Sequence, residues 1–204
     1  MKPRYIESAS LLNTIILKIF SASNLLDLSS KNNNFTKIID IIFKISVIKN
    51  MSRYIWSKLN NLQVGTFVEY YVKMEFAMYG FQVYTSEVDD RGLAFVARFN
   101  KSSFLSIQVK SLRKDTGYVF MTKNNFEPDP NLYLALGLLS EGNTPKLYLI
   151  PSTVWLEPNA VFVDRAYGEG YKSSPEWGVN ISKKNMSLLE PYLFDEVIKS
   201  LIKE

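Results

Sequence analysis

The sequence contains neither cysteine nor histidine, and these two absences exclude most families of catalytic chemistry. Without cysteine there is no disulfide, thiolate nucleophile, thiolate zinc site or iron–sulfur cluster, and a reducing cytoplasm is the expected location. Without histidine there is no Ser-His-Asp or Cys-His site, no histidine-ligated metal and no imidazole acid–base pair. An enzyme of this sequence must work with carboxylates, lysine, tyrosine, serine or a metal ion held by oxygen ligands.

Long apolar runs are also absent. No stretch approaches the about 20 apolar residues that span a bilayer. The N-terminus lacks the basic start, apolar run and small-residue cleavage site of a secretion signal. We therefore expect no membrane partner. The 204 residues, 47% of them apolar, are enough to bury one sizeable core.

Glycine is missing from residues 1–50, whereas all nine glycines lie from Gly65 onward. Residues 1–50 hold seven Lys/Arg against three acids, and residues 51–204 hold seventeen of each. We predict an N-terminal extension over 1–50, either helical, through the amphipathic run 37–49, or not part of the native protein, which would then start at Met51. The main domain is 51–204, where balanced charge means that any DNA-binding surface must be local.

The remaining sequence alternates helical and strand patterns. We predict helices over Gln63–Tyr79, ended by Gly80, and over Ser182–Ile202, and a loop from Asp164 to Gly178. Apolar alternation and short apolar runs predict strands at Phe81–Ser86, Leu93–Phe99, Phe104–Lys110, Tyr118–Lys123, Leu132–Leu139 and Lys146–Ile150.

Gln108 and Lys110 are two residues apart on a predicted strand, so their side chains lie on the same face. Lys110 on a central strand would be costly to bury without a charged partner, and Glu69 and Asp90 are the candidates. Taken alone, Gln108 and Lys110 also fit a solvated strand face, and Asp90 also fits a turn former. The order of helix, loop and strand favours a functional set instead.

These residues resemble the PD-(D/E)xK nuclease superfamily, in which a helix glutamate precedes a hairpin aspartate and a strand carries (D/E/Q)xK. Glu69 matches the glutamate, and Gln108-Val109-Lys110 matches the last motif in its glutamine variant. The resemblance covers residues 63–155 and implies an α/β fold of restriction-endonuclease type, with a central mixed sheet flanked by helices in αβββαβ order. The hairpin aspartate position holds Ala94, which cannot coordinate a cation.

The resemblance also implies the roles of the site residues. The catalytic set would be Lys110, Gln108, Glu69 and the position of Ala94. Mg²⁺, with Mn²⁺ as a substitute, would be held by Asp90, Glu69, Gln108 and the backbone of Val109. Past the strand, Ser111 and Arg113 would contact phosphates as nucleic-acid contacts.

The function that the resemblance implies is a Mg²⁺-dependent endodeoxyribonuclease of restriction, repair or recombination type, with DNA as partner. Double-strand cleavage would favour a homodimer. Ala94 leaves three explanations: an engineered inactive variant, a naturally degenerate nuclease, or replacement of the ligand by Asp90. The alternative function is a catalytically silent DNA-binding or assembly protein on a nuclease fold.

Overall fold

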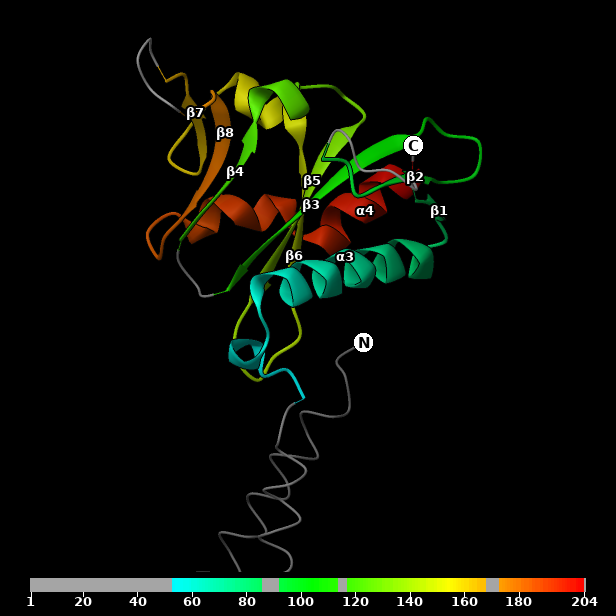
Figure 1. The fold of residues 1–204 in the computed structure, drawn as a ribbon. Helices are drawn as coiled ribbons and strands as arrows, with labels where there is room; N and C mark the ends of the chain where they lie inside the picture. The colour runs from blue at the N-terminus through cyan, green and yellow to red at the C-terminus, as the bar shows by residue number, and fades with distance from the viewer. Residues whose placement is uncertain (1–52, 86–91, 114–116, 168–172, 204) are drawn as a thin grey trace, which may run out of the picture. The chain divides into compact units, whose positions relative to one another are not determined.

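The computed structural model describes residues 53–85, 92–113, 117–167 and 173–203, and Figure 1 shows their arrangement. The α-helices among these residues are α3 and α4; of the short 3-10 helices, η1 precedes α3, η2 and η3 lie between strands, and η4 follows β8. In chain order the elements are η1 (Trp56–Lys58), α3 (Asn61–Met78), β1 (Gln82–Tyr84), β2 (Phe95–Arg98), β3 (Leu105–Arg113), β4 (Gly117–Thr122), η2 (Lys123–Asn125), β5 (Leu132–Leu139), β6 (Lys146–Pro151), η3 (Ser152–Leu156), β7 (Phe162–Arg165), β8 (Glu176–Ile181), η4 (Met186–Tyr192) and α4 (Phe194–Lys203).

Two sheets organise the described residues. The larger one has the order β1-β2-β3-β5-β6, and the smaller one has the order β4-β8-β7. In the larger sheet β3 and β5 are parallel, and the other neighbours are antiparallel. The prediction of an α/β fold with a central mixed sheet flanked by helices is therefore confirmed.

The helix α3 begins and ends at recognisable signals. Asn60 and Gln63 form a reciprocal capping box, in which each side chain accepts a hydrogen bond from the backbone N–H of the other at 2.9 Å. At the other end Gly80 has φ +87, a left-handed conformation that suits glycine. The predicted helix over 63–79 is confirmed, with two more residues at its start.

The buried face of α3 differs from the apolar face that its tyrosines and methionines predict. Tyr70, Met74 and Met78 are exposed. The side chains that face the sheet are spaced four apart and are Val64, Val68, Val72 and Phe76. Three of these four residues are valines. The contact between α3 and the sheet is close, because a Cβ at Gly137 of β5 would lie only 2.7 Å from the Val68 side chain.

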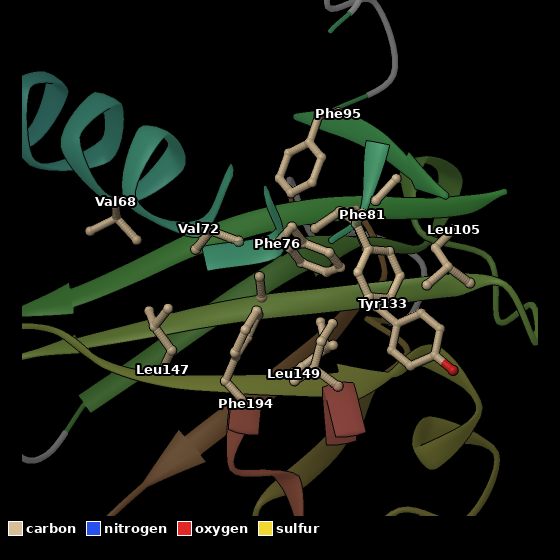
Figure 2. Packing of buried hydrophobic residues seen from close by; sticks show 14 of the residues in the cluster. Val68, Val72, Phe76, Phe81, Phe95, Leu105, Tyr133, Leu147, Leu149 and Phe194 are labelled. Carbon is tan, nitrogen blue, oxygen red and sulfur yellow. The ribbon is translucent and has the colours of Figure 1, made fainter. Parts of the chain in front are cut away.

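A first core cluster lies between the larger sheet and the two α-helices (Figure 2). Phe76 is fully buried at its centre, with the rings of Phe81, Phe95 and Phe194 at 5.2, 5.4 and 5.3 Å between centroids. Truncation of such a side chain to alanine typically costs about 3–5 kcal/mol. α3 and α4 therefore cover the same face of the larger sheet.

The opposite face of the larger sheet packs on the smaller sheet. A second core cluster joins Leu134, Leu136 and Tyr148 of the larger sheet to Val119, Val179 and other residues of the smaller one. η3 and η4 contribute Trp155 and Leu189 to it. The described residues thus form three layers: helices, the larger sheet, and the smaller sheet with its 3-10 helices.

Three predicted details differ in the structure. The αβββαβ order places a helix between β3 and β5, but the described part of this connection contains β4 and the single turn η2. The predicted loop 164–178 includes the end of β7 and the start of β8, which are stabilised by pairing with each other and, through β8, with β4. The predicted helix 182–202 is divided at Leu193 into η4 and α4.

Several predictions concern residues outside the described part of the chain. These are the extension over 1–50, a start at Met51, and Asp90. Among the described residues, no helix combines the length and apolarity that crossing a bilayer requires.

Candidate functional site

The strand β3 carries the predicted site residues on two opposite faces. Leu105, Ile107 and Val109 pack into the first core cluster, on the side of α3. Side chains alternate along a strand, so Ser106, Gln108 and Lys110 share the other face, as the sequence predicts. We call these three residues the even face of β3.

Gln108 is the most informative member of the even face. Its side chain is only 6% exposed, and its Oε1 has no hydrogen-bond partner among the described residues. A buried acceptor without a partner costs about 1–3 kcal/mol. Such groups are rare in folded proteins and are explained by an ordered water, an ion or a ligand. Gln108 is thus a buried side chain whose Oε1 still has the capacity to accept a hydrogen bond.

The loop that precedes β2 approaches Gln108 closely. A Cβ on Gly92 would lie 2.9 Å from Nε2 of Gln108, and φ of Gly92 is +74. Both features suit glycine, which adopts this conformation without a steric penalty. The predicted metal-binding loop and the predicted QxK strand therefore do meet, at Gly92 and Gln108.

Lys110 is partly buried on the same face. None of the ion pairs among the described residues includes it. Lysine ammonium groups are rarely removed from water without a partner, because the charge loses its hydration. Within the described residues, Lys110 is thus a partly buried cation without an ion-pair partner, and it lies on the same face as Gln108, whose Oε1 has no hydrogen-bond partner.

Ala94 lies just before β2, and its backbone N–H donates to the carbonyl of Ile107 at 2.9 Å. Its methyl group is partly buried and packs against the first core cluster. The backbone is thus held in place next to β3, as a hairpin ligand would require. The side chain supplies no oxygen atom.

Glu69 lies on α3, which covers the face opposite to Gln108 and Lys110. Its carboxylate accepts a hydrogen bond from Lys73 at 2.7 Å, one helical turn later. The Lys73 side chain is only 13% exposed, and its ammonium lies 5.7 Å from the ring centre of Phe95. Within the described residues, the ion-pair partner of Glu69 is therefore Lys73 and not Lys110. The i,i+4 spacing of Glu and Lys was the sequence signal for this pair.

Ser111 and Arg113 lie on the α3 side of β3 by the same alternation. The Arg113 guanidinium donates to the backbone carbonyls of Trp56 and Leu59 at 3.3 and 2.7 Å, and to the side chain of Asn61. These bonds tie the end of β3 to the residues that lead into α3. The structure thus separates Ser111 and Arg113 from the even face.

The described residues do not by themselves fit a Mg²⁺ site. Within them, no three Asp, Glu, His or Cys side chains gather closely enough to hold a metal ion. Gln108 offers one oxygen of the hard type that Mg²⁺ accepts, but this ion takes about six oxygen ligands and relies on one or two carboxylates. Asp90, the predicted carboxylate, belongs to segment 86–91, outside the described residues.

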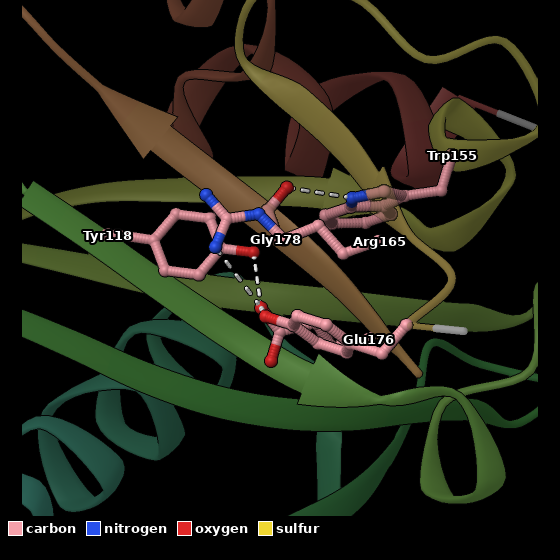
Figure 3. A network of polar contacts seen from close by, with 6 residues as sticks. Tyr118, Trp155, Arg165, Glu176 and Gly178 are labelled. Carbon is pink, nitrogen blue, oxygen red and sulfur yellow. Dashed lines mark hydrogen bonds and ion pairs between the residues drawn. The ribbon is translucent and has the colours of Figure 1, made fainter. Parts of the chain in front are cut away.

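A second polar cluster, which was not predicted from the sequence, lies on the smaller sheet (Figure 3). Glu176 is 6% exposed and accepts hydrogen bonds from the hydroxyls of Tyr118 and Tyr167 at 2.7 and 3.1 Å. Arg165 lies 3.8 Å from the same carboxylate and 4.3 Å from the ring centre of Tyr118. Burial and the neighbouring Glu176 raise the pKa of Tyr118 well above its ordinary value. Every member of this cluster is partnered, so it stabilises the sheet rather than forming an open site.

A hollow of about 350 Å³ lies between α3, β6 and α4, on the helix side of the larger sheet. Glu75, Asp195 and Glu196 line it, and Tyr79 donates to Asp195 at 3.0 Å. Burial and Asp195 raise the pKa of Tyr79. The hollow contains no residue of the predicted site.

No protein-family model matches the chain, and no curated protein matches it. Among solved structures the chain is similar to Hjc, a Holliday junction resolvase from the archaeal hyperthermophile Archaeoglobus fulgidus, with a TM-score of 0.43 and 14% sequence identity. The similarity covers 66% of this chain and 95% of that chain. A similarity of this size assigns no function to the chain.

Proposed function

We propose that the protein acts on DNA phosphodiesters through a nuclease-type site on the even face of β3. In this sequence the site binds DNA, and efficient hydrolysis requires a carboxylate that position 94 lacks. The observation that carries the proposal is the buried Oε1 of Gln108, which has no hydrogen-bond partner within the described part of the chain and lies two residues from the partly buried Lys110. The QxK spacing after a helix glutamate supports the nuclease type, because the PD-(D/E)xK resemblance rests on the same residues.

Each of the two side chains has a role in holding a phosphodiester. The Lys110 ammonium is a compact cation with three donors, suited to an anionic phosphate oxygen. Partial burial shields this contact from salt and makes it stronger than one on an open surface. Charge that develops on the phosphate during hydrolysis would be stabilised by the same ammonium. The Gln108 amide would hold a water or ligand donor beside the phosphate through its Oε1.

A divalent cation supplies this class of reaction with a water of lowered pKa and with neutralisation of phosphate charge. The described residues do not provide its full ligand set, because the Ala94 side chain has no oxygen and Glu69 is paired with Lys73. Restoring an aspartate at position 94 would add both a ligand and a negative charge beside β3, where the Ala94 backbone is bonded to Ile107.

A second candidate function is a catalytically silent DNA-binding or assembly protein on the same scaffold. The pairing of Glu69 with Lys73 favours it, because the helix carboxylate is already neutralised by a cation of the chain. In this case restoration of the carboxylate at position 94 would produce no cleavage, while DNA binding through Lys110 would persist.

The test is Ala94→Asp, assayed with Mg²⁺ or Mn²⁺ on plasmid and oligonucleotide DNA by gel electrophoresis. We expect cleavage by Ala94→Asp and none by Ala94→Asn, a matched control that adds the same bulk without the charge. Lys110→Ala in the Ala94→Asp background should reduce the cleavage rate at least 100-fold, the loss typical of a removed charge-stabilising group. Cleavage that survives Lys110→Ala would refute the assignment of the site. Absence of any DNA binding by the unaltered chain would refute the proposed function.

A further inference from the structure

Three residues near the β1–β2 edge of the larger sheet extend the even face of β3. Strand pairing places Tyr84 opposite Val96, and Val96 opposite Ser106, so Tyr84 shares the face of Ser106. Arg98 follows Val96 by two residues and therefore points to the same side. Phe104 precedes Ser106 by two residues, immediately before β3. We call Tyr84, Arg98 and Phe104 the hairpin patch.

The hairpin patch presents aromatic surface to solvent. Tyr84 is 47% exposed and Phe104 is 49% exposed, although each packs against the other with ring centroids 5.7 Å apart. Strands β1 and β2 lie at the edge of the larger sheet that is remote from β7 and β8 (Figure 1). The second core cluster, which covers this side of the sheet, contains none of the three residues.

A cation is fixed within this aromatic surface. The Cζ of Arg98 lies 4.8 Å from the ring centre of Phe104, and its Nε donates to the carbonyl of Ser102 at 2.9 Å. None of the ion pairs among the described residues includes Arg98. The two terminal nitrogens of its guanidinium thus remain available to an anion, while the contact with Phe104 limits the motion of the group.

The charge of the surrounding segment has one sign. Residues 95–110 contain the three cations Arg98, Lys101 and Lys110 and no acidic side chain, in a domain whose charges balance only when this segment is included. Aromatic rings interleaved with cations are the surface that single-stranded nucleic acids bind, because bases stack on the rings and phosphates contact the cations. A DNA duplex keeps its base faces stacked inside the helix, so it cannot use the rings in this way.

We infer that the hairpin patch binds unpaired nucleotides of a DNA strand whose phosphodiester lies at Gln108 and Lys110. The inference rests on the proposed function and names its substrate class: DNA with a single-stranded part beside the reacting position. The four residue-to-residue steps from Phe104, just before β3, to Gln108 span about 13 Å in extended backbone. This length corresponds to about four nucleotides of a stacked strand at about 3.4 Å each. One strand can therefore contact both the patch and the even face.

The experiment measures fluorescence anisotropy of three labelled DNAs with the full chain in the presence of a chelator, so that no cleavage occurs. The DNAs are a single strand, the same sequence as a duplex, and that duplex with an unpaired tail. Phe104→Ala should weaken binding of the single strand and of the tailed duplex on the order of tenfold, and of the plain duplex less than about twofold. Phe120→Ala is the matched control, because Phe120 is also 49% exposed but lies on β4 of the smaller sheet.

Two more variants separate loss of stacking from loss of folding. Phe104→Leu keeps apolar bulk without a ring and should bind like Phe104→Ala, whereas Phe104→Trp should retain binding and lose indole fluorescence when a base stacks on it. Arg98→Gln should reduce the salt dependence of single-strand binding, because it removes a phosphate contact. Thermal unfolding of each variant checks that it folds.

The outcomes distinguish the inference from the proposed function. If Lys110→Ala weakens DNA binding but Phe104→Ala and Phe104→Leu do not, the inference is wrong and the proposed function stands. Equal loss of duplex and single-strand binding by Phe104→Ala also overturns the inference. If the unaltered chain binds none of the three DNAs, both are wrong, and the patch is left as a surface for a protein partner.

Discussion

Gly92 lies directly against the amide of Gln108, so closely that a Cβ at position 92 would come within 2.9 Å of Nε2. Gly92, which leads into β2, therefore helps to position the side chain whose Oε1 is buried with no hydrogen-bond partner in the part of the chain that the structure describes. The conformation of the chain at Gly92 thus affects the position of the Gln108 amide in the candidate site.

Gly92→Ala should lower the free energy of unfolding by about 1–2 kcal/mol, because φ +74 is unfavourable for alanine. It should also weaken DNA binding, since the new methyl group displaces the Gln108 amide. Urea unfolding and anisotropy measure the two effects. Gly65→Ala is the control: Gly65 lies within α3, its Cβ would meet nothing within 4 Å, and the change should raise stability by about 0.5–1 kcal/mol. A Gly92→Ala protein as stable as the unaltered chain would contradict the assignment of strain to this position.

Gln108→Leu should separate binding from stability. Leucine has nearly the same volume and removes the buried oxygen that has no partner, so we expect the free energy of unfolding to stay the same or rise by up to about 1 kcal/mol. DNA binding by this variant should weaken. Urea unfolding and anisotropy again provide the readouts. A loss of more than about 2 kcal/mol would mean that the amide supports the fold, and a site role for Gln108 would then be unnecessary.

Arg113→Ala should lower the free energy of unfolding by about 2 kcal/mol, because it removes charged hydrogen bonds to the carbonyls of Trp56 and Leu59. It should leave the salt dependence of DNA binding unchanged. Lys110→Ala is the comparison, and it should reduce the slope of log affinity against log salt concentration by about one. A reduced slope for Arg113→Ala would restore the role of phosphate contact that the sequence predicts for this residue.

Stability should fall at alkaline pH because of Tyr118. Its pKa is raised in the folded state, above the ordinary value of 10.0, by burial and by the hydrogen bond to Glu176. Above pH 10 the unfolded chain releases this proton while the folded chain retains it, so the free energy of unfolding decreases as pH rises. Below pH 10 the contribution is fully present. Urea unfolding at pH 8, 10 and 11 should show the decrease, and Tyr118→Phe should make it shallower. At pH 8, the difference in free energy of unfolding between the unaltered chain and Tyr118→Phe measures the contribution of the hydrogen bond to Glu176.

The regular elements of the larger sheet could be predicted from the sequence because their signals are local. Gly80 marks the end of α3, and the apolar run 132–139 coincides with β5. Strands β7 and β8 could not be predicted in this way. The segment around Asp164 and Arg165 is polar and followed by glycines. Its strand conformation depends on pairing of β7 with β8, and of β8 with β4, which is far from both in the chain.

The candidate site was predictable in part for the same reason. Alternation along one strand places Gln108 and Lys110 on one face without any knowledge of the rest of the fold. Which face α3 covers is a tertiary property, and it decides that Arg113 bonds to the residues before this helix and that Glu69, which pairs with Lys73, lies opposite to Lys110. Residue type and spacing alone could not distinguish these roles from contacts to DNA.

Neighbouring residues of β3 point to opposite faces of the sheet, one toward the first core cluster and the other toward the proposed site. Odd-numbered residues such as Ile107 are held by the core, so selection for stable folding limits what they can become. Even-numbered residues such as Gln108 and Lys110 belong to the proposed site and would be under a separate constraint. A library that varies positions 104, 106, 108 and 110 while keeping 105, 107 and 109 would therefore explore new binding and catalytic properties with little loss of folded protein. The even face of β3 could thus be varied by mutation while the residues that pack in the first core cluster stay unchanged.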